Sequence, residues 1–111
     1  MVRDSLRALL EAYDFTIFDF GSCRDFLNRR ANVTAACLIV DIHMPHMTGL
    51  DLLRMLRKNS DPIPVILITG LRDTTTKSQA EALGVVALLD KPLAHTALLA
   101  AIERALASPR H

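Results

Sequence analysis

The chain has 111 residues, half of them hydrophobic, and its 13 basic and 12 acidic side chains give a net charge of +1. This length suits one small domain with a single core, and the composition excludes an intrinsically disordered chain. The balanced charge argues against an electrostatic nucleic-acid or membrane surface, and no apolar run approaches the roughly 20 residues that span a bilayer. No secretory pattern opens the chain, so we expect a cytoplasmic protein.

The first third of the chain predicts a helix, a strand and a second helix. Leucines at helical spacing indicate a helix over residues 2–13. Phe15–Phe20 is rich in aromatic and β-branched residues, which favours a strand. Ser22 and Asp25 have the spacing of a capping box and would begin a short helix over residues 23–30.

The middle of the chain predicts a buried strand followed by a capped helix. Cys37–Asp41 is a short apolar run that ends in a carboxylate, and we expect Cys37 to be a buried, reduced thiol. Thr48 and Asp51 form a second possible capping box for a helix that ends near Asn59. The residues predicted to form the buried face of this helix are Leu50, Leu53, Met55 and Leu56.

The last part of the chain repeats the alternation. Val65–Thr69 is a second apolar run. Asp73 or Thr74 can cap the next predicted helix, which would run to Leu83 and be stopped by Gly84. Val85–Asp90 predicts another strand, and a final amphipathic helix is expected over residues 95–106.

Strands that alternate with helices predict an α/β fold, in which helices cover both faces of a parallel sheet. Four strands and five helices would form one domain over residues 1–107, and residues 108–111 would be a tail.

Polar residues close three of the apolar runs: Asp41, Thr69 and Lys91. Ligands of open α/β sheets bind beyond the carboxyl ends of the strands, so these three side chains should converge. A carboxylate, a hydroxyl and an ammonium group together suit phosphate chemistry, with Asp41 as the nucleophile and Gly70 leaving the approach open. Structural roles, such as a capping carboxylate or a turn hydroxyl, are the alternative.

The loop after Asp41 has the pattern D-x-x-M-P-x-M-x-G over residues 41–49, and Thr69 and Lys91-Pro92 follow in order. This pattern resembles the receiver domain of two-component response regulators, over residues 2–106. The resemblance implies a flavodoxin-like, doubly wound parallel sheet and a cis bond before Pro92. It also implies that Asp41 is the phosphoacceptor, Thr69 the switch hydroxyl and Lys91 the phosphate-binding lysine.

The resemblance further implies a signalling module in a phosphorelay, and not an enzyme. A histidine kinase or a histidine phosphotransfer protein would phosphorylate Asp41, and the last helix–strand–helix face, residues 73–106, would change. Mg²⁺ would bind at Asp41 and the backbone carbonyl of His43. Many family members have an aromatic residue where this chain has Leu88, so we expect a muted rearrangement there.

The chain departs from the family at its start, where we expect the first β-strand and its acidic pair to be missing. Either the natural protein begins further upstream or the receiver is degenerate. Magnesium binding would then be weak and phosphorylation slow. Phe15–Phe20 could move beside Cys37–Asp41 and bring Asp19 towards Asp41, a second copy could supply a strand by swapping or edge pairing, or the fold could be marginal.

Two other functions compete with the phosphoacceptor. A phosphorylation-independent pseudo-receiver that binds partners is the main alternative. A phosphatase with a nucleophilic aspartate would need a second aspartate where this chain has His43. We expect no direct nucleic-acid binding, because no helix-turn-helix is predicted and any output domain would lie beyond His111.

Overall fold

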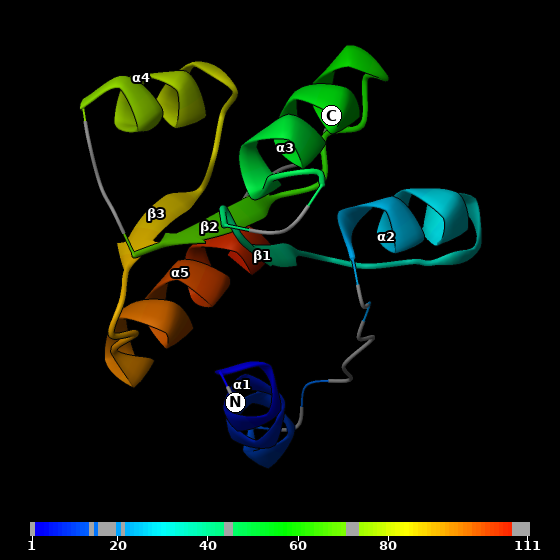
Figure 1. Ribbon diagram of the computed structural model, residues 1–111. Helices are drawn as coiled ribbons and strands as arrows, with labels where there is room; N and C mark the ends of the chain where they lie inside the picture. Colours follow the sequence, from blue (N-terminus) through cyan, green and yellow to red (C-terminus); the bar gives the residue numbers. More distant parts are fainter. Residues whose placement is uncertain are drawn as a thin grey trace.

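The computed structural model describes residues 2–13, 15, 20, 22–43, 46–70 and 74–107, with backbone alone for residues 2–6 (Figure 1). In chain order the elements are α1 (Val2–Ala12), α2 (Cys23–Arg29), the 3-10 helix η1 (Arg30–Asn32), β1 (Leu38–Asp41), α3 (Gly49–Lys58), β2 (Val65–Thr69), α4 (Thr74–Ala82), β3 (Ala87–Asp90) and α5 (His95–Ala107).

The described strands form one parallel sheet of three strands in the order β1–β2–β3. Its register pairs Leu38 with Val65 and Thr69 with Asp90. Every residue of β2 is buried. The continuous apolar run is therefore what a central parallel strand, covered on both faces, requires.

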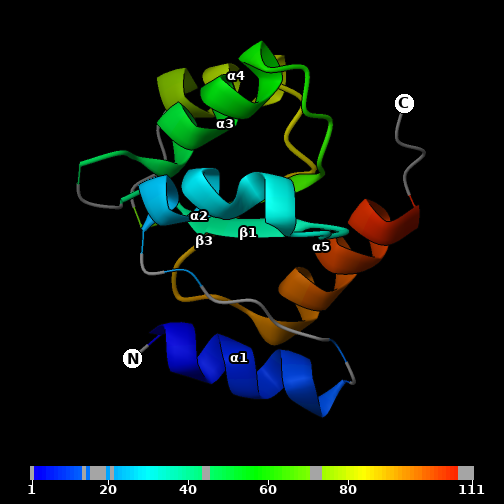
Figure 2. The ribbon, with the colours of Figure 1, turned by 90° about the vertical axis from the view of Figure 1, so that its right-hand side faces the viewer.

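Helices cover both faces of this sheet, with α2, α3 and α4 on one side and α1 and α5 on the other (Figure 2). Val65 and Leu67 of β2 belong to the core cluster that includes residues of α2 and α3. Ile66, between them, packs with residues of α1 and α5. Successive strand side chains point to opposite faces, so one strand contributes to both cores. The predicted α/β fold with a parallel sheet is confirmed.

The predicted strand over Phe15–Phe20 lies mostly outside the described residues, which include only its two ends. Phe20 packs edge-on against Phe26, with ring centroids 5.2 Å apart, in the α2–α3 core. Phe15 packs in the α1–α5 core instead, so the two ends contact opposite faces of the sheet. The fourth strand, and the approach of Asp19 to Asp41, stay predictions.

The ends of two helices follow the predicted local chemistry. Thr48 and Asp51 form the full capping box at the start of α3. After α4, Gly84 adopts a φ of 74°, and the N–H of Val85 donates to the carbonyl of Ala80 at 3.2 Å. This is the Schellman arrangement, in which a residue with left-handed backbone closes the helix, and it explains the glycine.

Three local predictions need correction. Met55 is 38% exposed, and Leu52, 1% exposed, takes its place because it lies one helical turn before Leu56. The strand predicted from Val85 begins only at Ala87. Cys37 is half-buried and not buried, because it precedes the paired residues of β1, although it is a free thiol as expected.

Candidate functional site

The carboxyl edge of the sheet brings the three predicted site residues to one place. Asp41 ends β1, Thr69 ends β2, and Lys91 directly follows β3. The N–H of Lys91 donates to the carbonyl of Thr69 at 2.9 Å, which ties the ends of the last two strands together. The peptide bond between Lys91 and Pro92 is cis, as the resemblance implies.

Asp41 and Lys91 form an ion pair at this edge, with the Lys91 Nζ 2.5 Å from the Asp41 Oδ2. The other carboxylate oxygen, Oδ1, accepts a hydrogen bond from the backbone N–H of His43 at 2.9 Å. The side chains of Asp41 and Lys91 are 27% and 35% exposed. The pair is therefore oriented by the fold and still open to a ligand from solvent.

Thr69 is the one buried polar residue among the described side chains, with 1% of its surface exposed. Its Oγ1 lies 3.4 Å from the Nε2 of His43, a long hydrogen bond whose donor depends on the imidazole tautomer. Thr69 and Asp41 thus share a neighbour, because His43 contacts the hydroxyl with its ring and the carboxylate with its backbone.

Two glycines border the site, and the backbone requires only one of them. A Cβ added to Gly49 would lie 2.8 Å from the carbonyl oxygen of Asp41, so α3 begins against the end of β1. A Cβ added to Gly70 would meet only the Cδ of Lys91, at an ordinary 3.6 Å. The packing of α3 against the end of β1 therefore requires a glycine at position 49, whereas Gly70 leaves space that a methyl group could occupy.

The described residues do not by themselves complete a magnesium site. Mg²⁺ prefers six oxygen ligands in octahedral geometry. Asp41 ends β1 at this edge, and both its carboxylate oxygens already accept hydrogen bonds. Within the described ranges no three His, Cys, Asp or Glu side chains are grouped to hold a metal ion. Met44, Pro45 and Asp19 lie outside those ranges.

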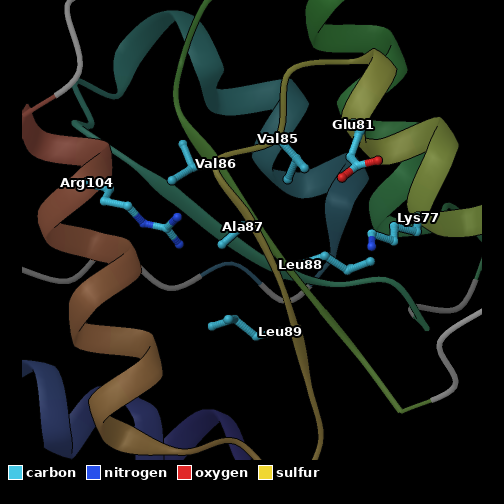
Figure 3. Close-up of a pocket in the computed structure, with 8 residues that line it drawn as sticks. All are labelled: Lys77, Glu81, Val85, Val86, Ala87, Leu88, Leu89 and Arg104. Carbon is cyan, nitrogen blue, oxygen red and sulfur yellow. The ribbon is translucent and has the colours of Figure 1, made fainter.

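The predicted switching face carries a hollow of about 280 Å³ between α4, β3 and α5 (Figure 3). Leu88 lines it from the strand, Lys77 and Glu81 from α4, and Arg104 from α5. Charged groups thus border an apolar strand surface. This surface is formed by β3, the strand that Lys91 directly follows.

Sequence reasoning missed two contacts that depend on folding. The family resemblance implies a role only for the backbone carbonyl of His43, whereas its ring contacts Thr69. No sequence pattern indicates the pair between Arg30 and Asp61. These residues lie 2.6 Å apart beyond the amino ends of the strands, at the end of the sheet opposite the site. A complementary charge pair 31 residues apart in the sequence has no local signal.

The sequence profile of the response regulator receiver domain matches residues 1–103. Among similar proteins, the transcriptional regulatory protein FixJ of Bradyrhizobium diazoefficiens is 32% identical over 95% of this chain and 51% of its own length. The response regulator protein TodT of Pseudomonas putida is 35% identical over 95% of this chain and 46% of its own length. The chain belongs to the response regulator receiver domain family.

Solved structures agree with this assignment. The crystal structure of FixJ-N superposes with a TM-score of 0.88, at 34% identity over 99% of this chain and 88% of the other. The response regulator StyR gives a TM-score of 0.87, at 37% identity over 95% of this chain and 53% of the other. The flavodoxin-like receiver fold is therefore confirmed. The chain spans about half the length of the curated relatives that it matches.

None of the helices in the described ranges has the length and apolar character needed to cross a membrane.

Proposed function

We propose that this chain accepts a phosphoryl group on Asp41 from the phosphohistidine of a histidine kinase or phosphotransfer protein. It would act as the receiver step of a two-component phosphorelay in the cytoplasm, and not as an enzyme in its own right. The observation that carries the proposal is the pair formed by Asp41 and Lys91, oriented at the carboxyl edge of the sheet and still accessible. An accessible carboxylate beside a fixed cation is what phosphoryl transfer to aspartate needs.

In the proposed step an Asp41 carboxylate oxygen attacks phosphorus and forms an acyl phosphate. The phosphorus–nitrogen bond of the donor breaks, and its imidazole leaves with the electron pair and takes up a proton. The Lys91 ammonium, now on the carboxylate, would move to the phosphoryl oxygens and neutralise the charge that develops there. Thr69 would donate its hydroxyl hydrogen to one of those oxygens.

Magnesium, when bound, would neutralise further phosphoryl charge. The described residues offer it the Asp41 carboxylate and the His43 carbonyl as predicted ligands, so we expect weak binding and slow transfer.

The proposed output is a shift in the α4–β3–α5 face. Thr69 responds to the phosphoryl group, and the hollow beside Leu88 lies on the adjacent strand. Leu88 is smaller than an aromatic side chain, so we expect its own rearrangement to be small. FixJ is named a transcriptional regulatory protein, and an output domain outside this chain would respond to the same face, with dimerisation as one route.

The proposal is tested by intact mass after incubation with a small phosphodonor and Mg²⁺. The wild-type chain should gain one phosphoryl group, and Asp41→Asn should gain none, because an amide is not a nucleophile for this reaction. Asp25→Asn is the matched control, since Asp25 forms an exposed pair with Arg29 within α2 and contacts neither Asp41 nor Lys91 in any described bond.

The proposed phosphoacceptor is supported if the wild type and Asp25→Asn gain a phosphoryl group and Asp41→Asn does not. If the wild-type chain also gains nothing, the phosphorylation-independent interaction domain becomes the better explanation for this chain.

A further inference from the structure

We infer that the imidazole of His43 is a positioning residue that holds the switch hydroxyl of Thr69 before phosphorylation and competes with the phosphoryl group for it. The inference rests on the proposed function, in which Thr69 turns to a phosphoryl oxygen. It assigns a role to a side chain that carries none in the transfer step itself.

His43 contacts both Asp41 and Thr69 from one position. Its backbone N–H donates to the Asp41 Oδ1 at 2.9 Å, which holds the His43 backbone beside the carboxylate. Its ring Nε2 lies 3.4 Å from the Thr69 Oγ1, on a different strand. The first contact anchors the backbone at Asp41, so the ring position follows from the geometry of the site.

The two side chains of this contact differ in burial. Thr69 is 1% exposed, whereas His43 is exposed. The imidazole therefore lies on the solvent side of a hydroxyl that the core otherwise encloses. A side chain in this position can be changed with little cost to folding, because surface substitutions disturb packing least.

The competition follows from the chemistry of a hydroxyl group. Thr69 has a single O–H to donate. If that hydrogen is directed to His43, a phosphoryl oxygen must displace the ring before it can accept the bond. If the ring donates instead, it still fixes the position of the oxygen. In both tautomers the contact stabilises the unphosphorylated arrangement, and removing it shifts the population towards the arrangement that binds phosphate.

The size of the effect is set by the length of the contact. Ordinary hydrogen bonds contribute modestly to an equilibrium, and this one is long and partly open to solvent. We therefore expect His43→Leu to increase the initial rate of Asp41 phosphorylation by about threefold, the low end of what one hydrogen bond changes. His43→Gln should restore the wild-type rate, because the end of its side chain reaches the position of Nε2.

The decisive measurement uses the unphosphorylated chain. Three-bond couplings to the Thr69 methyl carbon report the populations of its side-chain rotamers. One rotamer should dominate in the wild type, His43→Leu should average it, and His43→Gln should restore it. His46→Asn is the matched control, since His46 is an exposed histidine in the same loop, and asparagine tolerates its φ of 69°.

Unchanged couplings in His43→Leu would overturn the inference, as would changed couplings with an unchanged phosphorylation rate. Failure of the proposed function is a separate result, because it would appear as no phosphorylation of Asp41 in any variant. The couplings would then still decide whether His43 holds Thr69.

Discussion

The two edges of the sheet each carry a pair between an aspartate and a basic side chain, and the pairs differ in what surrounds them. At the carboxyl edge, Lys91 meets Asp41 through one contact, and both side chains stay about a third exposed. Beyond the amino ends of the strands, Arg30 contacts both carboxylate oxygens of Asp61, at 2.6 and 3.0 Å, and Asp61 is only 16% exposed.

Backbone contacts widen this difference. Arg30 also donates to the carbonyl of Val33, and the Ile63 N–H donates to Asp61. Arg57 donates to the carbonyls of Asp61, Ile63 and Leu83 at 2.8 to 3.0 Å. These bonds join loops that precede β2 and β3, so they stabilise the fold.

The comparison shows how one type of charge pair serves two purposes. An arginine that contacts both carboxylate oxygens and also donates to the backbone, as Arg30 does, is preorganised and resists rearrangement. A lysine that contacts an exposed carboxylate only once can move to another anion at little cost in free energy. The second arrangement is the one that suits the proposed phosphoacceptor.

The largest effect is expected when the exchangeable pair loses its cation. Lys91→Met should slow phosphorylation of Asp41 by about 100-fold, the usual size for removing one charge-stabilising group from a reacting site. The free energy of unfolding should change by less than about 1 kcal/mol, because the pair is exposed. Phosphorylation rates and chemical denaturation measure the two effects.

Lys58→Met, an exposed lysine at the end of α3, is the control and should change neither quantity. A large loss of stability in Lys91→Met would contradict the expectation that this pair can exchange partners, since it would show that the pair stabilises the fold.

The backbone at the carboxyl edge is less tolerant than its side chains. Gly49→Ala should lower the free energy of unfolding by about 2 kcal/mol, because the added Cβ must displace packed backbone. The displaced atom is the carbonyl oxygen of Asp41, which such a Cβ would approach to 2.8 Å. Chemical denaturation of the variant tests this, and a stability equal to wild type would show that α3 can move away from β1.

The pair beyond the amino ends should give a smaller loss that depends on pH. Hydrogen bonds from Arg30 lower the pKa of Asp61 below its ordinary value of 3.8, against the opposing effect of burial. The charged form is thus favoured by folding, and its contribution is present above pH 4 and is lost as the pH falls through the lowered pKa.

Asp61→Asn should therefore cost about 1–2 kcal/mol of unfolding free energy at pH 7, since it weakens a partly buried charged hydrogen bond. The difference from wild type should shrink below pH 3.8 and is measured by denaturation at several pH values. Phosphorylation at pH 7 should be unchanged, and a slower rate would show that the two edges are coupled.

The smallest effect is expected at Gly70. Gly70→Ala should change the unfolding free energy by less than about 0.5 kcal/mol, as for a tolerated surface substitution. The activation free energy of phosphorylation should change by no more than that. The new Cβ meets only the side chain of Lys91, at 3.6 Å. Measured beside Gly49→Ala, it separates the open part of this edge from the tightly packed part, and a large loss would show that Lys91 has no room to adjust.

Several features of this protein could be predicted from the sequence because they depend on local chemistry. The apolar run Val65–Thr69 forms the buried central strand, and Thr48 with Asp51 begins α3, as their sequence patterns indicate. Parallel strands end at one edge, so the order of Asp41, Thr69 and Lys91 was sufficient to place them together. The cis bond before Pro92 followed from the resemblance to the family.

The side-chain partners could not be predicted in this way. Helical periodicity allowed both Met55 and Leu52 at the buried face of α3, and only packing placed Leu52 inside. The pairing of Arg30 with Asp61 joins segments 31 residues apart, with no repeat or motif to indicate it.

The sequence by itself determined the alternating elements, the parallel sheet and the edge at which its polar residues meet, because residue periodicity and strand direction dictate these. Only the tertiary structure decided which atoms touch there: Lys91 on Asp41, and the ring of His43 on Thr69. The physical reason is that a side chain's direction depends on the neighbours that packing brings to it from distant parts of the chain.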